Sequence, residues 1–233
     1  MEESSNDNFN FNNSIESKLV FASTHTIFEK FNHIYNSKDL NKQIIKSITH
    51  NLREIIKENI HNNQMKYVVK SDLFYLSRLP PISIEDYIKR IFNYTKMNLS
   101  SLILSIIYID RFCESNGYIL SLNNIHRILL AACLLSIKFN EDININTKYY
   151  ANVAGVSVTD LNNLEYYFYV KLKFSLYIDY DFYQKYFEYF CKNINVDNKK
   201  CINSDLNKED RKKRYWKQKL KGKKLFIFLQ GFI

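Results

Sequence analysis

Hydrophobic side chains recur at intervals of three and four residues along most of the chain, which is the spacing of one face of an α-helix. Before Pro80-Pro81, a clear stripe covers residues 41–60 and a weaker one covers residues 15–35. After the two prolines, the same periodicity indicates helices at residues 83–92, 99–115, 121–139, 146–155 and 157–174, and an amphipathic segment at residues 181–194. The pattern therefore predicts a bundle of five helices with short connections, flanked by further helices.

Residue types at the predicted helix ends support these boundaries. Ser83 and Ser157 are each followed three residues later by an aspartate, which resembles a capping box at a helix N-terminus. Gly117 and Gly155 stand where the second and fourth helices would end. The helix of residues 121–139 is apolar on nearly every side, so we expect it to lie at the centre of the bundle.

Composition favours the same fold class. The 233 residues include only four glycines and two prolines, whereas sheet-rich folds use many such residues in turns. The longest apolar runs, near residues 102–109 and 128–137, fall short of the roughly 18–20 residues that span a membrane. The polar start MEESSNDNFNFNNS is unlike a secretory signal. We therefore expect an all-α intracellular protein, nuclear and/or cytoplasmic, without a membrane partner.

The net charge of +9 is concentrated near the end of the chain. Residues 199–224 hold 12 Lys/Arg and 3 Asp/Glu, and the other residues hold 21 of each. A neutral domain argues against nucleic-acid binding by the domain itself. Residues 210–224 interleave basic side chains with Tyr215 and Trp216. This tail fits a nuclear-import signal, a nucleic-acid contact or a solvated segment, and the sequence does not choose between them.

Candidate catalytic and metal-binding patterns are weak. The four cysteines show no CxxC spacing, and the five histidines show no metal-ligand spacing. We predict no metal site and no cofactor. A Gly-rich phosphate loop and a kinase catalytic set are missing, so the chain is not itself a kinase. Asp110, Cys113 and His126 are close in sequence, but core positions explain them better than a catalytic role does.

Three ordered motifs resemble the cyclin box: YIDRF at residues 108–112, SIKFNED at 136–142 and LEYYFYVKLKF at 164–174. The segments SRLPPISIEDYIKRIF at 77–92 and TKYYANVAGVSVTDLNNLE at 147–165 resemble a narrower group, the single-box P/U-type cyclins related to fungal phosphate-regulatory cyclins. Each motif alone is weak, but their order and spacing together are specific.

The resemblance implies a five-helix cyclin box that binds a cyclin-dependent kinase and moves the kinase's C-helix into its active position. It implies that Lys138 and Glu165 form the pair that hydrogen-bonds the kinase backbone. Leu135, Phe139 and Tyr169 are candidates for the adjoining apolar patch, placed by their offsets from that pair. Such a patch supplies contact area, while the polar pair fixes register.

Structural roles are the alternatives for the same residues. Lys138 lies near the C-terminus of its own helix, where a cation is favoured and its head can stay in water. Glu165 suits a solvated helix flank, and the three apolar residues suit the core. Asp110 is interpreted as structural, with Arg90 and Arg111 as candidate partners.

Two departures from the narrower group bear on partner choice. The fourth helix ends with Ala154-Gly155 where the group usually has two glycines, and Asn140 replaces the first acid after Lys-Phe. Neither departure removes the pair of Lys138 and Glu165.

The predicted organisation has five parts: a polar leader at 1–14, N-terminal helices at 15–80, the cyclin box at 81–178, an extra helix at 179–198 and a basic tail at 199–233. The predicted function is a regulatory subunit of a cyclin-dependent kinase, forming a heterodimer with it, in cell-cycle or nutrient-linked control. The alternatives are a cyclin-box factor in transcription or nucleic-acid binding, and a helical scaffold without a kinase partner; a helical enzyme ranks behind both.

Overall fold

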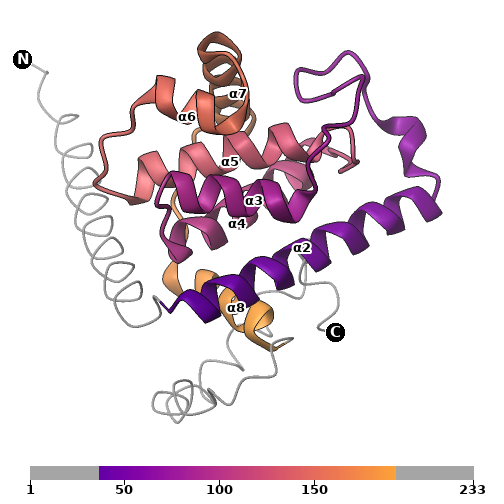
Figure 1. Cartoon of the computed structure of the whole chain (residues 1–233). Coiled ribbons are helices and arrows are strands. Elements are labelled where there is room, and N and C mark those ends of the chain that lie inside the picture. Colours follow the sequence, from indigo (N-terminus) through magenta and orange to yellow (C-terminus); the bar gives the residue numbers. More distant parts are fainter. Residues whose placement is uncertain (1–36, 193–233) are drawn as a thin grey trace, which may run out of the picture.

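The computed structural model describes residues 37–192, which form seven α-helices and one short 3-10 helix with no strand among them (Figure 1). The elements are α2 (Lys38–His61), η1 (Gln64–Tyr67), α3 (Ile84–Tyr94), α4 (Leu99–Asn116), α5 (Ile125–Asn140), α6 (Thr147–Ala154), α7 (Val158–Lys171) and α8 (Tyr180–Lys192). The all-α class is thereby confirmed. The predicted leader, the helix expected at residues 15–35 and the basic tail lie outside the described residues.

Helix α5 forms the centre of the fold, as its sequence predicts. Between Ile125 and Ile137 every side chain except Arg127 is buried. The helix packs against α3, α4 and α7, and Figure 1 shows it crossing the middle of the bundle. A helix that is apolar all round is stable only when neighbours cover it on all sides, and these three helices supply that cover.

Helices α2 and α8, the first and the last of the described helices, pack on the same side of this bundle. Helix α8 packs against both α2 and α4, and Figure 1 shows α2 and α8 together below α4. Ile44, Ile48 and Leu52 on the predicted stripe of α2 are fully buried. The hydroxyl of Tyr189 in α8 donates a hydrogen bond to Asn51 in α2. The segments before and after the five central helices thus share one core with them.

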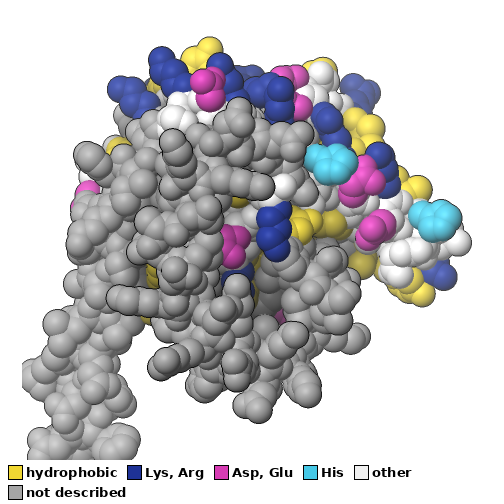
Figure 2. Space-filling view, turned by 90° about the horizontal axis from the view of Figure 1, so that it is seen from below, with side chains coloured by type: hydrophobic (Ala, Val, Ile, Leu, Met, Phe, Trp, Pro, Cys, Tyr) yellow, Lys and Arg dark blue, Asp and Glu magenta, His cyan; other side chains and the backbone are white. Residues whose placement is uncertain are grey.

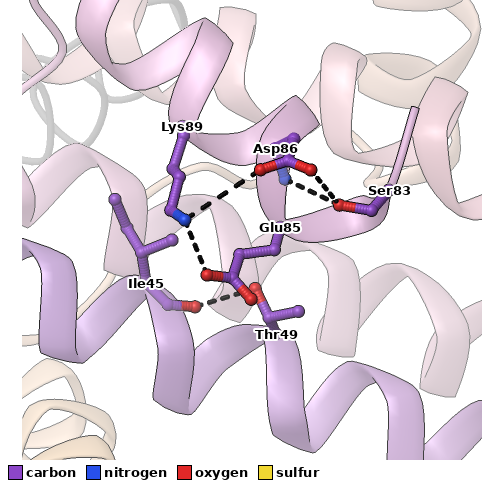
Figure 3. A network of polar contacts seen from close by, with 6 residues as sticks. All are labelled: Ile45, Thr49, Ser83, Glu85, Asp86 and Lys89. Atoms are coloured by element: carbon purple, nitrogen blue, oxygen red, sulfur yellow. Dashed lines mark hydrogen bonds and ion pairs between the residues drawn. The ribbon is translucent and has the colours of Figure 1, made fainter.

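Helices α3 and α7 begin at the predicted serine caps, and Figure 3 shows the cap of α3. Ser83 Oγ accepts a hydrogen bond from the backbone N–H of Asp86 at 3.1 Å, and Ser157 accepts one from Asp160 in the same way. In a capping box the acid bonds the serine backbone, but the Asp86 carboxylate instead accepts a 2.7 Å bond from the Ser83 hydroxyl.

Helix ends after α4 and α6 also follow the prediction. Gly117 and Gly155 take the left-handed conformation, with φ of 58° and 75°, which glycine adopts at little cost. Helix α7, in contrast, ends at Lys171 rather than at the predicted residue 174, because Lys173 and Phe174 both have positive φ.

The connection from α2 to α3 is held by an aromatic cluster that the periodic pattern did not predict. Phe74 is fully buried, and its ring contacts Phe112 and Phe168 edge to face at 5.6 and 6.0 Å between centroids. Asp72 accepts hydrogen bonds from the hydroxyls of Tyr118 at 2.8 Å and Tyr167 at 3.2 Å. This segment is therefore anchored on α4 and α7, although it forms no long helix.

Charges on the described surface are mixed. Seen from below, lysine and arginine side chains alternate with aspartate and glutamate around the rim of the described part (Figure 2). On α2, Lys42 lies 3.8 Å from Asp39, and Lys57 lies 2.6 Å from Glu54. No helix between residues 37 and 192 is both long and apolar enough to cross a membrane.

Candidate protein-binding site

Lys138 lies in the last turn of α5 with its side chain 37% exposed. The residues that precede it on the same helical line, including Leu134 and Leu135, are buried. The helix thus emerges from the core at its C-terminal end and brings the ammonium group to the surface. A cation is favoured there because the helix dipole is negative at that end.

Glu165 comes from α7 and pairs with Lys138. The Lys138 Nζ lies 2.7 Å from both carboxylate oxygens of Glu165, and the Glu165 side chain is 17% exposed. The packing of α7 against α5 brings these residues together, because Glu165 adjoins the face of α7 that Leu161, Leu164 and Phe168 bury in the core. The structure therefore joins two residues that the sequence placed in one site, and neither is an isolated, solvated charge.

The pair retains unused hydrogen-bonding capacity. An ammonium group has three donors, and a carboxylate has about four acceptor positions. The contact of Nζ with the two carboxylate oxygens uses only part of this capacity, and both side chains are partly exposed. The pair can therefore offer a donor and an acceptor, a few ångströms apart, to the backbone of another protein.

The three predicted patch residues differ in exposure. Leu135 is only 5% exposed and belongs to the core. Phe139 and Tyr169 are half-buried and pack on the core with one part of each ring at the surface. Phe139 and Tyr169 thus fit a contact surface beside the pair, whereas the side chain of Leu135 is buried in the core.

Phe174 adds an aromatic side chain that the sequence analysis missed. Its ring is 59% exposed and stands edge to face on Tyr169, with 4.8 Å between centroids and 86° between planes. Its φ of 58° is a left-handed conformation, which is a genuine outlier for a bulky residue. The sequence does show an apolar residue, Phe174, at the predicted end of the helix. Nothing in the sequence indicates the left-handed backbone conformation of that residue.

The polar residues of the YIDRF motif bond to the chain that follows α7. Asp110 is fully buried and accepts a hydrogen bond from the Tyr186 hydroxyl of α8. The sequence did not suggest this tyrosine as a partner of Asp110, and a structural role for Asp110 stays a prediction. Arg111 reaches the backbone oxygens of Ser175 and Tyr177, and Arg90 lies exposed on α3.

Glu141, directly after α5, is a buried carboxylate with a structural contact. It is 8% exposed, and its Oε1 accepts a hydrogen bond from the backbone N–H of Asn98, the N-cap of α4, at 3.0 Å. A carboxylate is favoured at a helix N-terminus, but burial raises the pKa of Glu141 in spite of the hydrogen bond from the backbone N–H of Asn98. The acid after Lys-Phe thus ties the end of α5 to the start of α4.

Cysteine and histidine side chains form no reactive group in the part of the chain that the structure describes. No three potential metal ligands gather between residues 37 and 192. Burial raises the pKa of Cys133 to about 12, and a neutral buried thiol is unreactive. His126 Nε2–H donates a hydrogen bond to the carbonyl oxygen of Ile82, 3.1 Å away. These residues serve packing.

Comparison with known proteins assigns the family. A family model described as cyclin matches residues 12–176. The chain is 37% identical over 118 residues to Cyclin-U2-1 of Arabidopsis thaliana, which covers 50% of this chain and 53% of that protein. It is 32% identical over 109 residues to Cyclin-P3-1 of Oryza sativa subsp. japonica, which covers 47% of this chain and 46% of that protein.

The chain spans about half the length of these curated relatives. The matches to proteins of both the U and P types agree with the narrower resemblance seen in the sequence. The all-α bundle with its central α5 agrees with the family match over most of the described residues. The chain belongs to the cyclin family, and within that family it is similar to the P/U-type cyclins.

Proposed function

We propose that the chain is a regulatory subunit that binds and activates a cyclin-dependent protein kinase through a surface centred on Lys138 and Glu165. Cyclins are regulatory proteins and not enzymes, so the family assignment supports a regulatory role. The observation that carries the proposal is the partly exposed ion pair between α5 and α7, with Nζ 2.7 Å from the carboxylate. Residues 81–178 are the proposed cyclin box, preceded and followed by supporting helices.

The chemistry of the surface suits backbone recognition. Lys138 offers donors to carbonyl groups, and Glu165 offers acceptors to N–H groups, as at a helix end and the loop before it. Phe139, Tyr169 and Phe174 supply apolar contact area beside the pair, and aromatic side chains are enriched at the energetically important centres of interfaces. The polar pair then fixes the register of the partner.

In the free chain the two charged groups bond to each other. Binding therefore exchanges part of their mutual contact for bonds to the partner, and the pair holds the two side chains in position beforehand. Pre-organisation of this kind lowers the entropy lost on association. We propose that the complex acts in the nucleus and/or cytoplasm in cell-cycle or nutrient-linked control.

The proposal is tested by capture of kinases from extract of the cells in which the gene is native. The immobilised chain is compared with Lys138→Glu and with Lys148→Glu, a matched charge reversal at an exposed lysine of α6. We expect a cyclin-dependent kinase, identified by mass spectrometry and active on a test substrate, with the chain and with Lys148→Glu. We expect its loss with Lys138→Glu.

The same variants are examined by circular dichroism and thermal unfolding. Lys138→Glu should keep its helix content, because Lys138 is exposed and its loss opens no cavity. Capture of the kinase by folded Lys138→Glu at the level of the unaltered chain would contradict the proposed site, and absence of any kinase from all captures would contradict the proposed function.

A further inference from the structure

The connector between α7 and α8, residues 172–179, has an unusual backbone at its start. Lys173 and Phe174 have φ of 54° and 58°, so two successive residues other than glycine are left-handed. Their N–H groups bond back to the carbonyls of Val170 and Tyr169. Left-handed non-glycine residues persist only when the surrounding structure holds them, so other contacts must fix this connector.

Two side chains of α4 hold the connector through its backbone oxygens. Arg111 Nη1 donates to Ser175 O at 2.7 Å, and both of its Nη atoms lie 3.4 Å from Tyr177 O. The Tyr108 hydroxyl donates to Leu176 O at 2.9 Å. Three consecutive carbonyl groups thus accept hydrogen bonds from two residues one helical turn apart.

The side chains of the connector fix the same arrangement from the core. Leu176 and Ile178 are 5% and 4% exposed, so their side chains are anchored while the carbonyls face α4. Tyr108 is fully buried, and burial raises its pKa, so its hydroxyl stays protonated and remains a donor. Arg111 keeps its charge under all ordinary conditions, and its planar fork suits two acceptors at once.

The connector carries the exposed side chain of Phe174. Its ring leans on Tyr169, at 4.8 Å between centroids, and Tyr169 stands one helical turn after Glu165 on α7. A free connector would let Phe174 leave the left-handed conformation, because that conformation is costly for a bulky residue. The position of this exposed ring against Tyr169, one helical turn from Glu165, therefore depends on the bonds made by Arg111 and Tyr108.

We propose that Arg111, together with Tyr108, is a positioning residue for partner binding, which holds the connector so that Phe174 stands beside the Lys138–Glu165 site. Arg111 acts through Phe174 and not by contact with the partner. This inference rests on the proposed function. It adds that two residues of α4 determine the shape of the binding surface without touching the partner.

A double-mutant cycle tests the inference. Kinase affinity is measured for the full chain and for Arg111→Gln, Phe174→Ala and the double variant. We expect each single variant to bind the kinase about tenfold more weakly, an effect of the size expected when one important contact residue is lost. Because Arg111 acts through Phe174, the double variant should bind no more weakly than Phe174→Ala alone, so the two losses should not add.

Two further measurements separate positioning from general stability. Arg111→Lys keeps the charge and one donor group, and we expect it to restore part of the affinity. Hydrogen exchange should accelerate at the amides of residues 173–178 in Arg111→Gln and remain unchanged in α5. Tyr108→Phe removes only the hydroxyl bond to Leu176 and keeps the ring in the core, so it gives the same test if Arg111→Gln fails to fold.

The outcomes are distinguishable from failure of the proposed function. If the unaltered chain binds kinase and Lys138→Glu does not, but Arg111→Gln and Tyr108→Phe bind like the unaltered chain, this inference alone is wrong. Additive losses in the double variant would also overturn it, because Arg111 would then act independently of Phe174. If the unaltered chain binds no kinase, the proposed function fails and this inference falls with it.

Discussion

Three buried or half-buried carboxylates join separate elements of the fold. Asp72 accepts hydrogen bonds from the hydroxyls of Tyr118 and Tyr167, and Asp110 accepts one from the hydroxyl of Tyr186. Glu141 accepts one from the backbone N–H at the start of α4. Buried acids are tolerated when hydrogen bonds satisfy them. Each acid here links residues that are far apart in sequence, so these side chains determine how the helices meet.

Glu141 gives a prediction about pH. Burial raises its pKa in the folded chain, above the value of about 4.3 that glutamate has when unfolded. Between those two values the folded state binds more protons, so this residue's contribution to stability falls as pH rises. Glu141→Gln removes the titration and keeps an acceptor for Asn98.

The measurement is the free energy of unfolding by denaturant at several pH values from 3 upward, for the unaltered chain and Glu141→Gln. The stability of the unaltered chain minus that of the variant should be constant at the lowest pH and then decrease as pH rises through the window. Parallel stability curves would show that Glu141 does not titrate differently in the folded state.

Tyr186 gives a second prediction at this scale. Tyr186→Phe removes the hydroxyl that donates to the buried carboxylate of Asp110, and hydrogen bonds to charged groups contribute about 1.5–3 kcal/mol. We expect a loss of that order in the free energy of unfolding. Tyr150→Phe is the control, because Tyr150 is equally buried and its hydroxyl has no hydrogen-bond partner among residues 37–192. An equal loss in both variants would refute the role given to Asp110.

At the scale of elements, periodicity and end signals predicted the central helices well. The stripes of α2 and α3, the serine caps and the glycine ends all depend on local sequence, so the sequence was sufficient for them. The end of α7 was predicted three residues too late, because Leu172-Lys173-Phe174 continues the helical pattern and contains no glycine or proline. Arg111 and Tyr108, far away in sequence, bond the backbone that follows that end.

The anchoring of residues 72–76 was not predictable for the same reason. This segment has no helical period, and its stability comes from Phe74 in a pocket made by α4 and α7. We expect Phe74→Ala to lower the free energy of unfolding by about 3–5 kcal/mol, because a large buried ring leaves a cavity. Leu79→Ala, at a 54% exposed position of the same connection, is the control and should change the free energy of unfolding by less than about 0.5 kcal/mol. Similar small losses in the two variants would mean that the segment is not anchored.

At the scale of the whole molecule, the candidate site lies where the central helix leaves the core. The sequence predicted that Lys138 and Glu165 belong together only through the ordered motifs, since the residues are 27 positions apart. It could not predict their mutual bond, the burial of Leu135 or the placement of Phe174, because these depend on how α5, α7 and the connector pack. The residues that bring the site together are distributed over α4, α5 and α7.

The central claim is that the Lys138–Glu165 pair contacts a kinase and does not serve the fold alone. The most direct measurement compares kinase affinity and thermal stability for the unaltered chain, Lys138→Glu and the swapped variant Lys138→Glu/Glu165→Lys. The swap restores the attraction between the two residues but exchanges the donor and acceptor offered to a partner. We predict that it regains stability and still fails to bind kinase, and a swapped variant that binds like the unaltered chain would contradict the account.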